Sequence, residues 1–286
     1  IARKLGLLFG LIVQDLSGAG AKQSGLRGGA LISKVAHAVE GSALKAANGL
    51  VVVSPAMKDV VIGLGVDESR ISQILNYSAR KIDSVNREQA RSRFGWTADE
   101  FVVIHTGNMG AKQALENVVE AAQELNGNYR IKIYLVGHGN QESNLKALCQ
   151  GKKNISVMAA VSDVDYSALL SAADLLLVNE RTTQMEMSLP SKLTSYLYSE
   201  RPVLAAVPRG GATWKFLDGV AELVEAGDPN ALASKIEELS TNKSRLTELA
   251  SLGLEFAVKN LNPAVGRAKY LEWVREMLEV TKKVSG

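Results

Sequence analysis

The chain has 286 residues, 46% of them hydrophobic, and a formal net charge of +3. This size predicts a globular protein with one large domain or two smaller ones. The small net charge and interspersed basic and acidic residues do not indicate a nucleic-acid-binding surface. The single Cys149 excludes an internal disulfide framework, and three histidines are too few to suggest a dedicated transition-metal site.

No apolar run reaches the roughly 20 residues that span a bilayer, and the first residues carry no signal pattern. We therefore expect a cytoplasmic protein. Residues 1–100 hold 13 basic and 9 acidic residues. A solvated mixed surface explains this excess more simply than peripheral contact with the inner face of a membrane, which stays an alternative. The chain begins at Ile1 and a strand pattern follows within ten residues, so we expect its natural beginning to be missing.

Short apolar segments alternate along the chain with segments whose apolar residues recur every three or four positions. Most of the short segments are apolar throughout, which is typical of parallel strands buried on both faces. The alternation predicts a doubly wound α/β architecture. The predicted strands cover residues 10–14, 49–54, 101–106, 131–137, 155–159, 174–179, 202–207 and 221–225.

Three helices are predicted with defined limits. One covers 111–125 and carries an apolar stripe. A second follows Asp228 as its N-cap and has Pro229 as its first residue. The third covers about 264–283, and the charged stretch 79–97 before the later strands predicts an interdomain linker with a leading helix.

Ligands of an open parallel sheet bind beyond the carboxyl ends of its strands. The turn at 105–113, HTGNMGAKQ, has glycines that allow close backbone approach, a lysine, and a following helix whose amides would attract phosphate. A tight connection without a ligand explains this turn as simply. In the second turn, LVGHGN, Gly137 and Gly139 flank His138, which we expect to be a loop residue rather than a catalyst.

The third turn lies within MSLPSKLTSYLYSERPV, residues 187–203. Pro190 predicts a helix that starts at Leu189 or Pro190, with Ser191 and Lys192 in its first turn. A lysine there opposes the helix dipole and costs about 0.3–1 kcal/mol unless an anion lies between them. The hydroxyl, the ammonium and the amides together suit a diphosphate. A lysine that merely extends into water is the alternative.

Five segments in this order and spacing resemble the C-terminal nucleotide-sugar-binding domain of family 4 glycosyltransferases, which have the two-domain GT-B fold. They are GNMGAKQALENVVEAA, YLVGHGNQESNLKAL, YSALLSAADLLLV, MSLPSKLTSYLYSERPV and ELVEAGDPNALASKIEEL. The resemblance covers about residues 95–265, and the upstream segments are less specifically similar to the later part of that family's N-terminal domain.

The resemblance implies an α/β, GT-B-like chain with two Rossmann-like doubly wound parallel-sheet domains, the N-terminal one incomplete. Residues 1–84 would form the partial acceptor-side domain and 85–263 the nucleotide-sugar-binding domain. The last helix, 264–286, would pack back toward the N-terminal domain.

The resemblance also implies a donor site. The glycine-rich turn and Lys112 would hold the diphosphate, the backbone near Val161 would meet the base, and the LPSK segment would face the phosphates and the sugar. The donor-binding residues are then Gly107, Asn108, Met109, Gly110, Lys112, Gln113, Gly137, Gly139, Val161, Ser162, Leu189, Pro190, Ser191, Lys192 and Ser195.

One departure from the family concerns ribose recognition. Many members carry two glutamates eight positions apart, and the corresponding residues here are Met187 and Ser195. Glu186 is one residue out of step, and Glu180 lies further away. A serine hydroxyl hydrogen-bonds more weakly than a carboxylate, so this chain would bind the ribose differently.

The resemblance implies a retaining glycosyltransferase that uses a nucleotide-diphosphate sugar and a glycan or lipid-linked acceptor, with no metal or cofactor. Asp15, Lys112 and Lys192 are the candidate catalytic residues. Asp15 would orient or activate an acceptor hydroxyl, although a helix cap is the more ordinary role for an Asp after a strand. The alternatives are a nucleotide-sugar-binding module without catalysis and a nucleotide-sugar epimerase, for which only His105, His138 and Asp15 offer acid or base groups.

Overall fold

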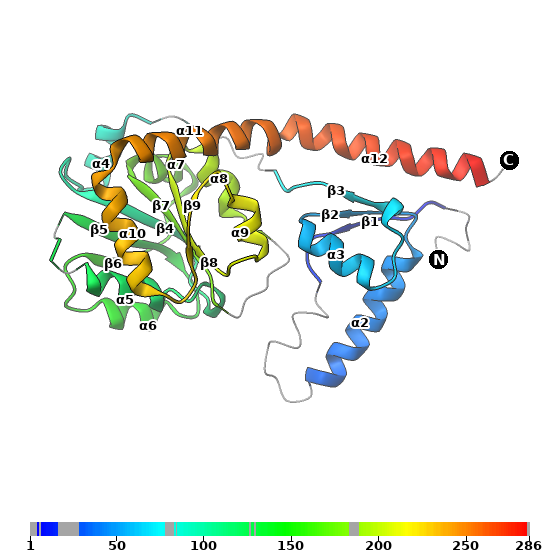
Figure 1. The fold of residues 1–286 in the computed structure, drawn as a ribbon, viewed down its shortest axis with the longest axis horizontal. Coiled ribbons are helices and arrows are strands. Elements are labelled where there is room, and N and C mark those ends of the chain that lie inside the picture. The colour runs from blue at the N-terminus through cyan, green and yellow to red at the C-terminus, as the bar shows by residue number, and fades with distance from the viewer. Residues whose placement is uncertain are drawn as a thin grey trace. The chain divides into compact units, whose positions relative to one another are not determined.

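The computed structural model describes residues 5, 7–16, 29–77, 83, 85–125, 127–128, 130–182 and 189–284. Contacts divide the chain into two compact units. The first comprises Ile1–Tyr77, Glu186–Leu189 and Asn260–Gly286, and the second comprises Ser78–Met185 and Pro190–Lys259. Each unit contains its own parallel sheet (Figure 1).

The second unit is built on a six-stranded parallel sheet with the order β6-β5-β4-β7-β8-β9. The chain moves outward from β4 in one direction and then returns to place β7 on the other side of β4. Adjacent connections therefore diverge between β4 and β7, and this is where open α/β sheets bind ligands. The strands are β4 Phe101–Asn108, β5 Ile131–His138, β6 Ile155–Met158, β7 Leu175–Asn179, β8 Val203–Val207 and β9 Glu222–Glu225. All six strands predicted for this region are confirmed, with ends shifted by one or two residues.

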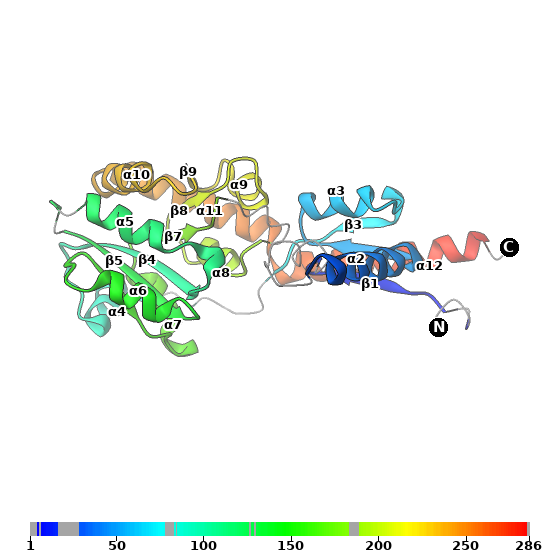
Figure 2. The same ribbon diagram turned by 90° about the horizontal axis from the view of Figure 1, so that it is seen from below.

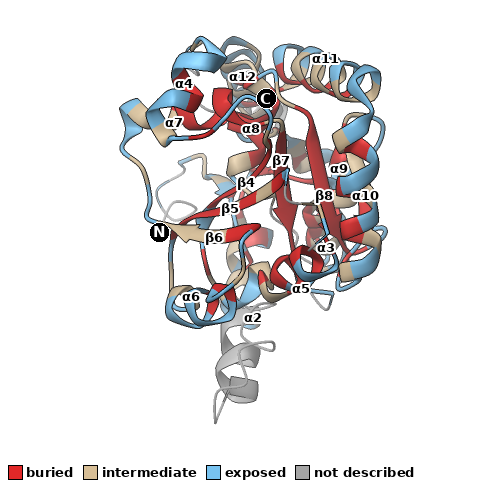
Figure 3. Cartoon of the chain, turned by 90° about the vertical axis from the view of Figure 1, so that its left-hand side faces the viewer, coloured by how far each residue is buried: buried red, intermediate tan, exposed pale blue. Residues whose placement is uncertain are grey.

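Helices cover both faces of this sheet because its strands are apolar on both faces. Figure 2 shows α5 and α10 on one side and α4 and α7 on the other. Val103 of β4 and Leu177 of β7 share one core cluster with Val118 of α5 and Ile236 of α10. The strands are buried between these layers (Figure 3). The helices are α4 Arg87–Phe94, α5 Glu116–Glu124, α6 Glu142–Cys149, α7 Asp163–Ala172, α8 Lys192–Tyr198, α9 Ala212–Leu217, α10 Pro229–Thr241 and α11 Lys243–Asn260.

Two helix predictions had different outcomes. The start of α10 is confirmed: the Asp228 carboxylate accepts from the Ala231 amide at 2.9 Å, and Pro229 is the first residue. The single helix over 111–125 is wrong. A short 3₁₀ helix, η3 Ala111–Gln113, ends at Ala114, whose φ of 42° is left-handed, and α5 starts only at Glu116. The Asn179 side-chain amide donates to the carbonyls of Gln113 (2.8 Å) and Ala114 (3.0 Å), so it takes acceptors that a continuous helix would use.

The first unit contains three parallel strands in the order β1-β2-β3. The strands predicted at 10–14 and 49–54 are confirmed as β1 and β2, whereas β3 was not predicted. Ser54 caps α3 by accepting from the Met57 amide at 3.1 Å. The elements are β1 Gly10–Val13, α2 Gly29–Ala46, β2 Gly49–Val52, α3 Pro55–Gly63, η2 Glu68–Arg70, β3 Ile71–Gln73 and α12 Pro263–Val284.

Helix α12 packs against β1 and β2 where these strands carry glycine. A Cβ on Gly10 would lie 2.7 Å from the Trp273 ring, and one on Gly49 would lie 2.6 Å from the Met277 sulfur. The two glycines therefore make room for large side chains of the last helix. Although α12 runs over 22 residues, neither it nor any other helix in the described ranges is long and apolar enough to cross a membrane.

Candidate functional site

The candidate site lies in the second unit, at the carboxyl ends of β4, β5 and β7. Strands β4 and β5 stay paired through Gly107 with Gly137 and Asn108 with His138, so β4 runs two residues further than predicted. The strand order reverses between β4 and β7, next to this turn. The geometry therefore brings the first two predicted turns to the place where a ligand is expected.

Glycine is required in these two turns because the backbones nearly touch. A Cβ on Gly137 would lie 1.9 Å from the Gly107 carbonyl oxygen, and one on Gly139 would lie 2.5 Å from the Met109 carbonyl oxygen. Gly107 has a φ of 114°, which side-chain-bearing residues rarely adopt. The close packing leaves the tip of the turn open, since Gly107 and Asn108 are exposed while Met109 is buried.

Lys192 enters this turn from the start of α8. A Cβ on Gly107 would lie 3.5 Å from the Lys192 ammonium nitrogen, Nζ. The same nitrogen lies 3.0 Å from His105 Nε2. His105 Nδ1 lies 3.0 Å from the Leu177 carbonyl oxygen, which can only accept, so Nδ1 carries the proton and Nε2 accepts from Lys192.

The surroundings of this pair disfavour positive charge. Burial lowers the pKa of Lys192 from 10.5 to about 7, against the opposing effect of Glu180. Burial, together with the neighbouring Lys192, lowers the pKa of His105 well below its usual value, so the imidazole is neutral. Glu180 directly follows β7, is buried, and accepts from the Thr213 hydroxyl at 2.7 Å. An incoming anion would restore the ammonium form of Lys192, because an opposite charge raises the pKa of a lysine.

Tyr196 hydrogen-bonds α8 to β4 and so fixes the position of Lys192. Its hydroxyl accepts from the Thr106 amide at 2.7 Å and lies 3.1 Å from the Thr106 hydroxyl. Tyr196 is four residues beyond Lys192, so the two side chains occupy the same face of α8. The Tyr166 hydroxyl of α7 also reaches Thr106, at 3.3 Å. Two helices are thus anchored one residue before Gly107.

The segment Gly110–Gln113 is held by contacts within the turn and with β7. The Gly110 amide donates to the Gln113 side-chain oxygen at 3.1 Å. The carbonyl of Lys112 accepts from the Arg181 amide at 3.0 Å, which brings this segment beside the end of β7, while the Lys112 residue is exposed. The predicted helix amides do not follow this turn directly, since α5 begins at Glu116.

The LPSK segment differs in part from its prediction. The helix begins at Lys192 and not at Leu189 or Pro190, because Ser191 is the N-cap and the first turn closes through a bond from the Leu193 amide to the Pro190 carbonyl at 3.1 Å. The Ser191 side chain makes no capping bond and is exposed.

The remaining predicted residues lie in three settings. Ser162 caps α7: its hydroxyl accepts from the Asp165 amide at 3.2 Å and donates to the Asp165 carboxylate at 2.7 Å, and Val161 precedes it. Ser195 is buried within α8. Asp15 belongs to the first unit, where it is exposed and accepts from the Leu16 amide at 2.8 Å. Met187 and Glu186 lie outside the described residues.

Sequence reasoning did not place His105, Glu180 or Tyr196 in the donor site. Glu180 had a usable signal, since it is the first residue after a predicted strand that ends next to β4. His105 opens the turn at 105–113, but the sequence indicated it only as an acid or base group of an epimerase. Tyr196 gave no such signal, because a buried polar residue inside a helix pattern looks like any other core position. Within the described ranges, no group of three or more His, Cys, Asp or Glu side chains could hold a metal ion.

Residues 86–253 match the model of the family described as glycosyl transferases group 1. This segment covers more than half of the chain and contains the whole six-stranded sheet. The chain belongs to this family. The expected family resemblance and the expected α/β, GT-B-like fold class are thereby confirmed.

Two curated relatives carry glycosyltransferase names. The chain is 27% identical over 219 residues to WcaI of Escherichia coli (strain K12), which is named for colanic acid biosynthesis; the match covers 73% of this chain and 54% of WcaI. It is 24% identical over 180 residues to WbjE of Pseudomonas aeruginosa, covering 62% of this chain and 44% of WbjE. The chain thus spans about half the length of the curated relatives it matches.

Solved structures show the same fold at low identity. The crystal structure of Anabaena Alr3699/HepE in complex with UDP and glucose matches with a TM-score of 0.77 and 16% identity over 96% of this chain and 73% of that one. Sucrose-phosphate synthase from Thermosynechococcus elongatus matches with a TM-score of 0.77 and 18% identity, over 96% of this chain and 69% of that one.

Proposed function

We propose that this family member binds a nucleotide-diphosphate sugar at the turns after β4 and β5 and that the whole protein transfers the sugar to a glycan or lipid-linked acceptor. The single observation that carries the proposal is the contact of Lys192 with both His105 and the Gly107 turn at the switch point of the sheet. The Anabaena Alr3699/HepE structures in complex with UDP support the choice of donor class.

In this proposal Lys192 supplies the positive charge that the leaving diphosphate requires. Negative charge builds on the diphosphate as the sugar departs, and a fixed cation in a partly buried site stabilises that charge more strongly than water does. Lys112, exposed on the same turn, would act as a second cation. Lysines and backbone amides take the place of a metal ion in this scheme, and no cofactor is required.

The finer features of the proposal rest on the family resemblance. They are retention of the sugar's anomeric configuration, a polysaccharide or glycolipid pathway, and a role for Asp15 in orienting the acceptor hydroxyl. The location in the cytoplasm, with peripheral contact to the inner membrane face, is likewise proposed. Ser195 would leave ribose recognition to other groups, because it is buried within α8.

Titration calorimetry with UDP and GDP tests donor binding. The wild type should bind one of the two, and the Lys112→Ala, Lys192→Ala double variant should lose at least about ten-fold in affinity, since a hydrogen bond to a charged group contributes roughly 1.5–3 kcal/mol. Equal affinity in both proteins would refute the site. Sugar transfer by the longer natural protein then separates an enzyme from a binding module: donor binding without turnover in that protein would favour the module.

A further inference from the structure

A cavity lies at the end of the six-stranded sheet where the strands begin, opposite to the candidate donor site. It has a volume of about 670 Å³, and the starts of β4, β5 and β8 reach it through Phe101, Ile131 and Pro202. One face of α11, from Leu246 to Leu254, forms a further wall. In parallel strands the starts and ends lie at opposite edges, so this cavity is separate from the Gly107 turn. Its volume is that of a small-molecule site.

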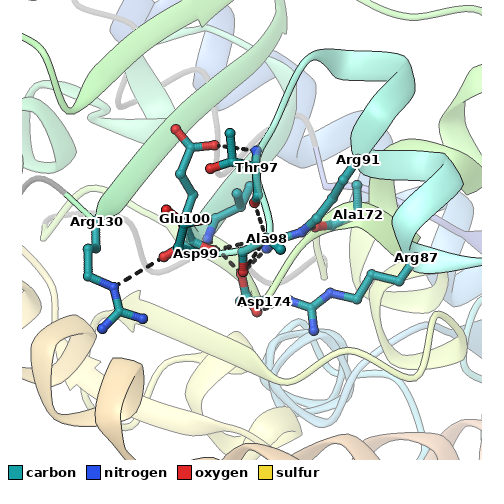
Figure 4. Close-up of polar contacts among 10 residues, drawn as sticks. Arg87, Arg91, Thr97, Ala98, Asp99, Glu100, Arg130, Ala172 and Asp174 are labelled. Carbon is teal, nitrogen blue, oxygen red and sulfur yellow. Dashed lines mark hydrogen bonds and ion pairs between the residues drawn. The ribbon is translucent and has the colours of Figure 1, made fainter.

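The wall of this cavity carries four basic and four acidic residues, but Arg201 takes part in none of the ion pairs among the described residues. Asp174 pairs with Arg87 through one carboxylate oxygen and with Arg91 through the other (Figure 4). The second oxygen also accepts from the Val102 amide at 2.8 Å. Both oxygens of Asp174 are therefore occupied. The charges that act on Arg201 are those of the Arg87 and Arg91 guanidinium groups and of the Asp174 and Glu200 carboxylates.

The other acidic groups do not supply a partner for Arg201. The Glu100 carboxylate accepts from the Thr97 amide at 2.9 Å, and Arg130 donates to the Asp99 backbone at 3.2 Å (Figure 4). Glu200 adjoins Arg201 in the chain and is exposed. The Arg201 Nε is buried and has no hydrogen-bond partner among the described residues. Burial and the neighbouring Arg87 lower the pKa of Arg201.

The hydroxyl groups of the cavity wall have no free proton with which to bind an anion. The wall hydroxyls donate to backbone carbonyls of their own helices, at 2.7 Å for Ser240 and 3.0 Å for Thr241, Thr247 and Ser251. A hydroxyl has one proton, so these groups have none left for a ligand. The charged donors that remain are guanidinium and ammonium groups, which favour phosphate and carboxylate oxygens. The Asn128 side-chain amide also lines the cavity.

We propose that this cavity binds a small metabolite through a phosphate or carboxylate group held by Arg201, with Lys243 and Arg130 at the rim. Phe101, Ile131 and Leu246 offer apolar surface for the rest of the molecule. The anion would pair with the guanidinium group of Arg201, which forms no ion pair among the described residues. This site is independent of the proposed donor site, and either can exist without the other.

Inorganic phosphate and citrate are the probes, titrated separately by calorimetry at constant ionic strength. The titrations use the Lys192→Met protein, so that the Lys192 ammonium of the donor site does not contribute to phosphate binding. Arg201→Met should weaken binding of the preferred anion at least about ten-fold, since hydrogen bonds to charged groups are the strong ones. Arg209→Met, which changes an exposed arginine elsewhere on the same unit, should leave it unchanged.

A second pair of variants keeps the test valid if Arg201→Met fails to fold. Thr247→Asp places a carboxylate in the wall of the cavity and should abolish anion binding. Thr247→Asn, whose side chain has the shape of aspartate without its charge, should retain it. The preferred probe identifies the ligand group as phosphate or carboxylate. The proposal is overturned if neither probe binds the Lys192→Met protein, or if Thr247→Asp binds as tightly as Thr247→Asn.

Discussion

Binding of UDP should take up a proton through Lys192. In the free protein, burial holds the pKa of Lys192 at about 7. His105 contacts the Lys192 nitrogen, and the charge of Glu180 acts on it. A diphosphate next to this nitrogen should return the pKa toward its ordinary value of 10.5. At pH 8 about a tenth of the free protein then carries the Lys192 charge, so binding should take up about 0.9 proton per UDP.

The uptake should depend on pH in a defined direction. At pH 7 it should fall to about 0.5 proton, because half of the free protein is already protonated there. Measurements belong above pH 7.5, where the second phosphate ionisation of the nucleotide, with a pKa of about 6, no longer contributes. His105 adds nothing in this range, since its pKa lies well below the usual value. Calorimetric titrations in buffers of different ionisation enthalpy give the number of protons directly.

Burial of Lys192 should destabilise the folded protein at pH values below 10.5, which is the pKa of this lysine in the unfolded chain. The unfolded chain binds more protons than the folded one between pH 7 and 10.5, so stability should rise with pH through this window. The whole difference corresponds to at most about 5 kcal/mol. Lys192→Met should therefore be more stable than the wild type at pH 7 and should bind UDP without proton uptake.

Lys153→Met is the matched control, because this exposed lysine precedes β6 and so lies where the strands begin, away from the donor turns. It should keep the full proton uptake and the pH dependence of unfolding. The reasoning is refuted if Lys192→Met takes up the same number of protons as the wild type, or if the wild type takes up fewer than about 0.2 at pH 8.

Three further changes should alter stability, as measured by denaturant unfolding. Gly137→Ala should cost about 3 kcal/mol and weaken UDP binding, because its Cβ would collide with the Gly107 backbone. Asp174→Ala should cost about 3–5 kcal/mol, since it leaves Arg91, whose side chain is 5% exposed, without its carboxylate. Glu200→Gly should stabilise by about 1 kcal/mol, because the residue has a left-handed φ of 57°.

The first two of these changes each have a control within the chain. Gly63→Ala, a helical glycine with open space around its Cβ, should be neutral or slightly stabilising. Glu142→Gln breaks an exposed ion pair with Lys146 and should change stability by less than about 1 kcal/mol. An unchanged Gly137→Ala protein, an Asp174→Ala cost no larger than that of Glu142→Gln, or a destabilised Glu200→Gly protein would contradict the respective argument.

The sequence by itself determined the local elements of this protein. Apolar runs predicted eight of the nine strands that the described residues form, and Asp228 with Pro229 predicted the start of α10. The sequence also indicated the glycine turns and Lys192, because a strand end, a glycine and a proline each restrict the backbone conformation of only a few neighbouring residues. β3 escaped prediction because it is three residues long and forms through pairing with β2.

Only the tertiary structure decided which of these residues meet. His105 and Lys192 lie 87 positions apart and come together because β7 pairs with β4. Asn179 breaks the predicted helix after Gln113 from a strand 66 residues away. Arg201 gains its charged neighbours from Arg87 and Arg91 of α4 and from Asp174, the residue before β7. These contacts depend on strand order and long-range packing, which no local pattern specifies.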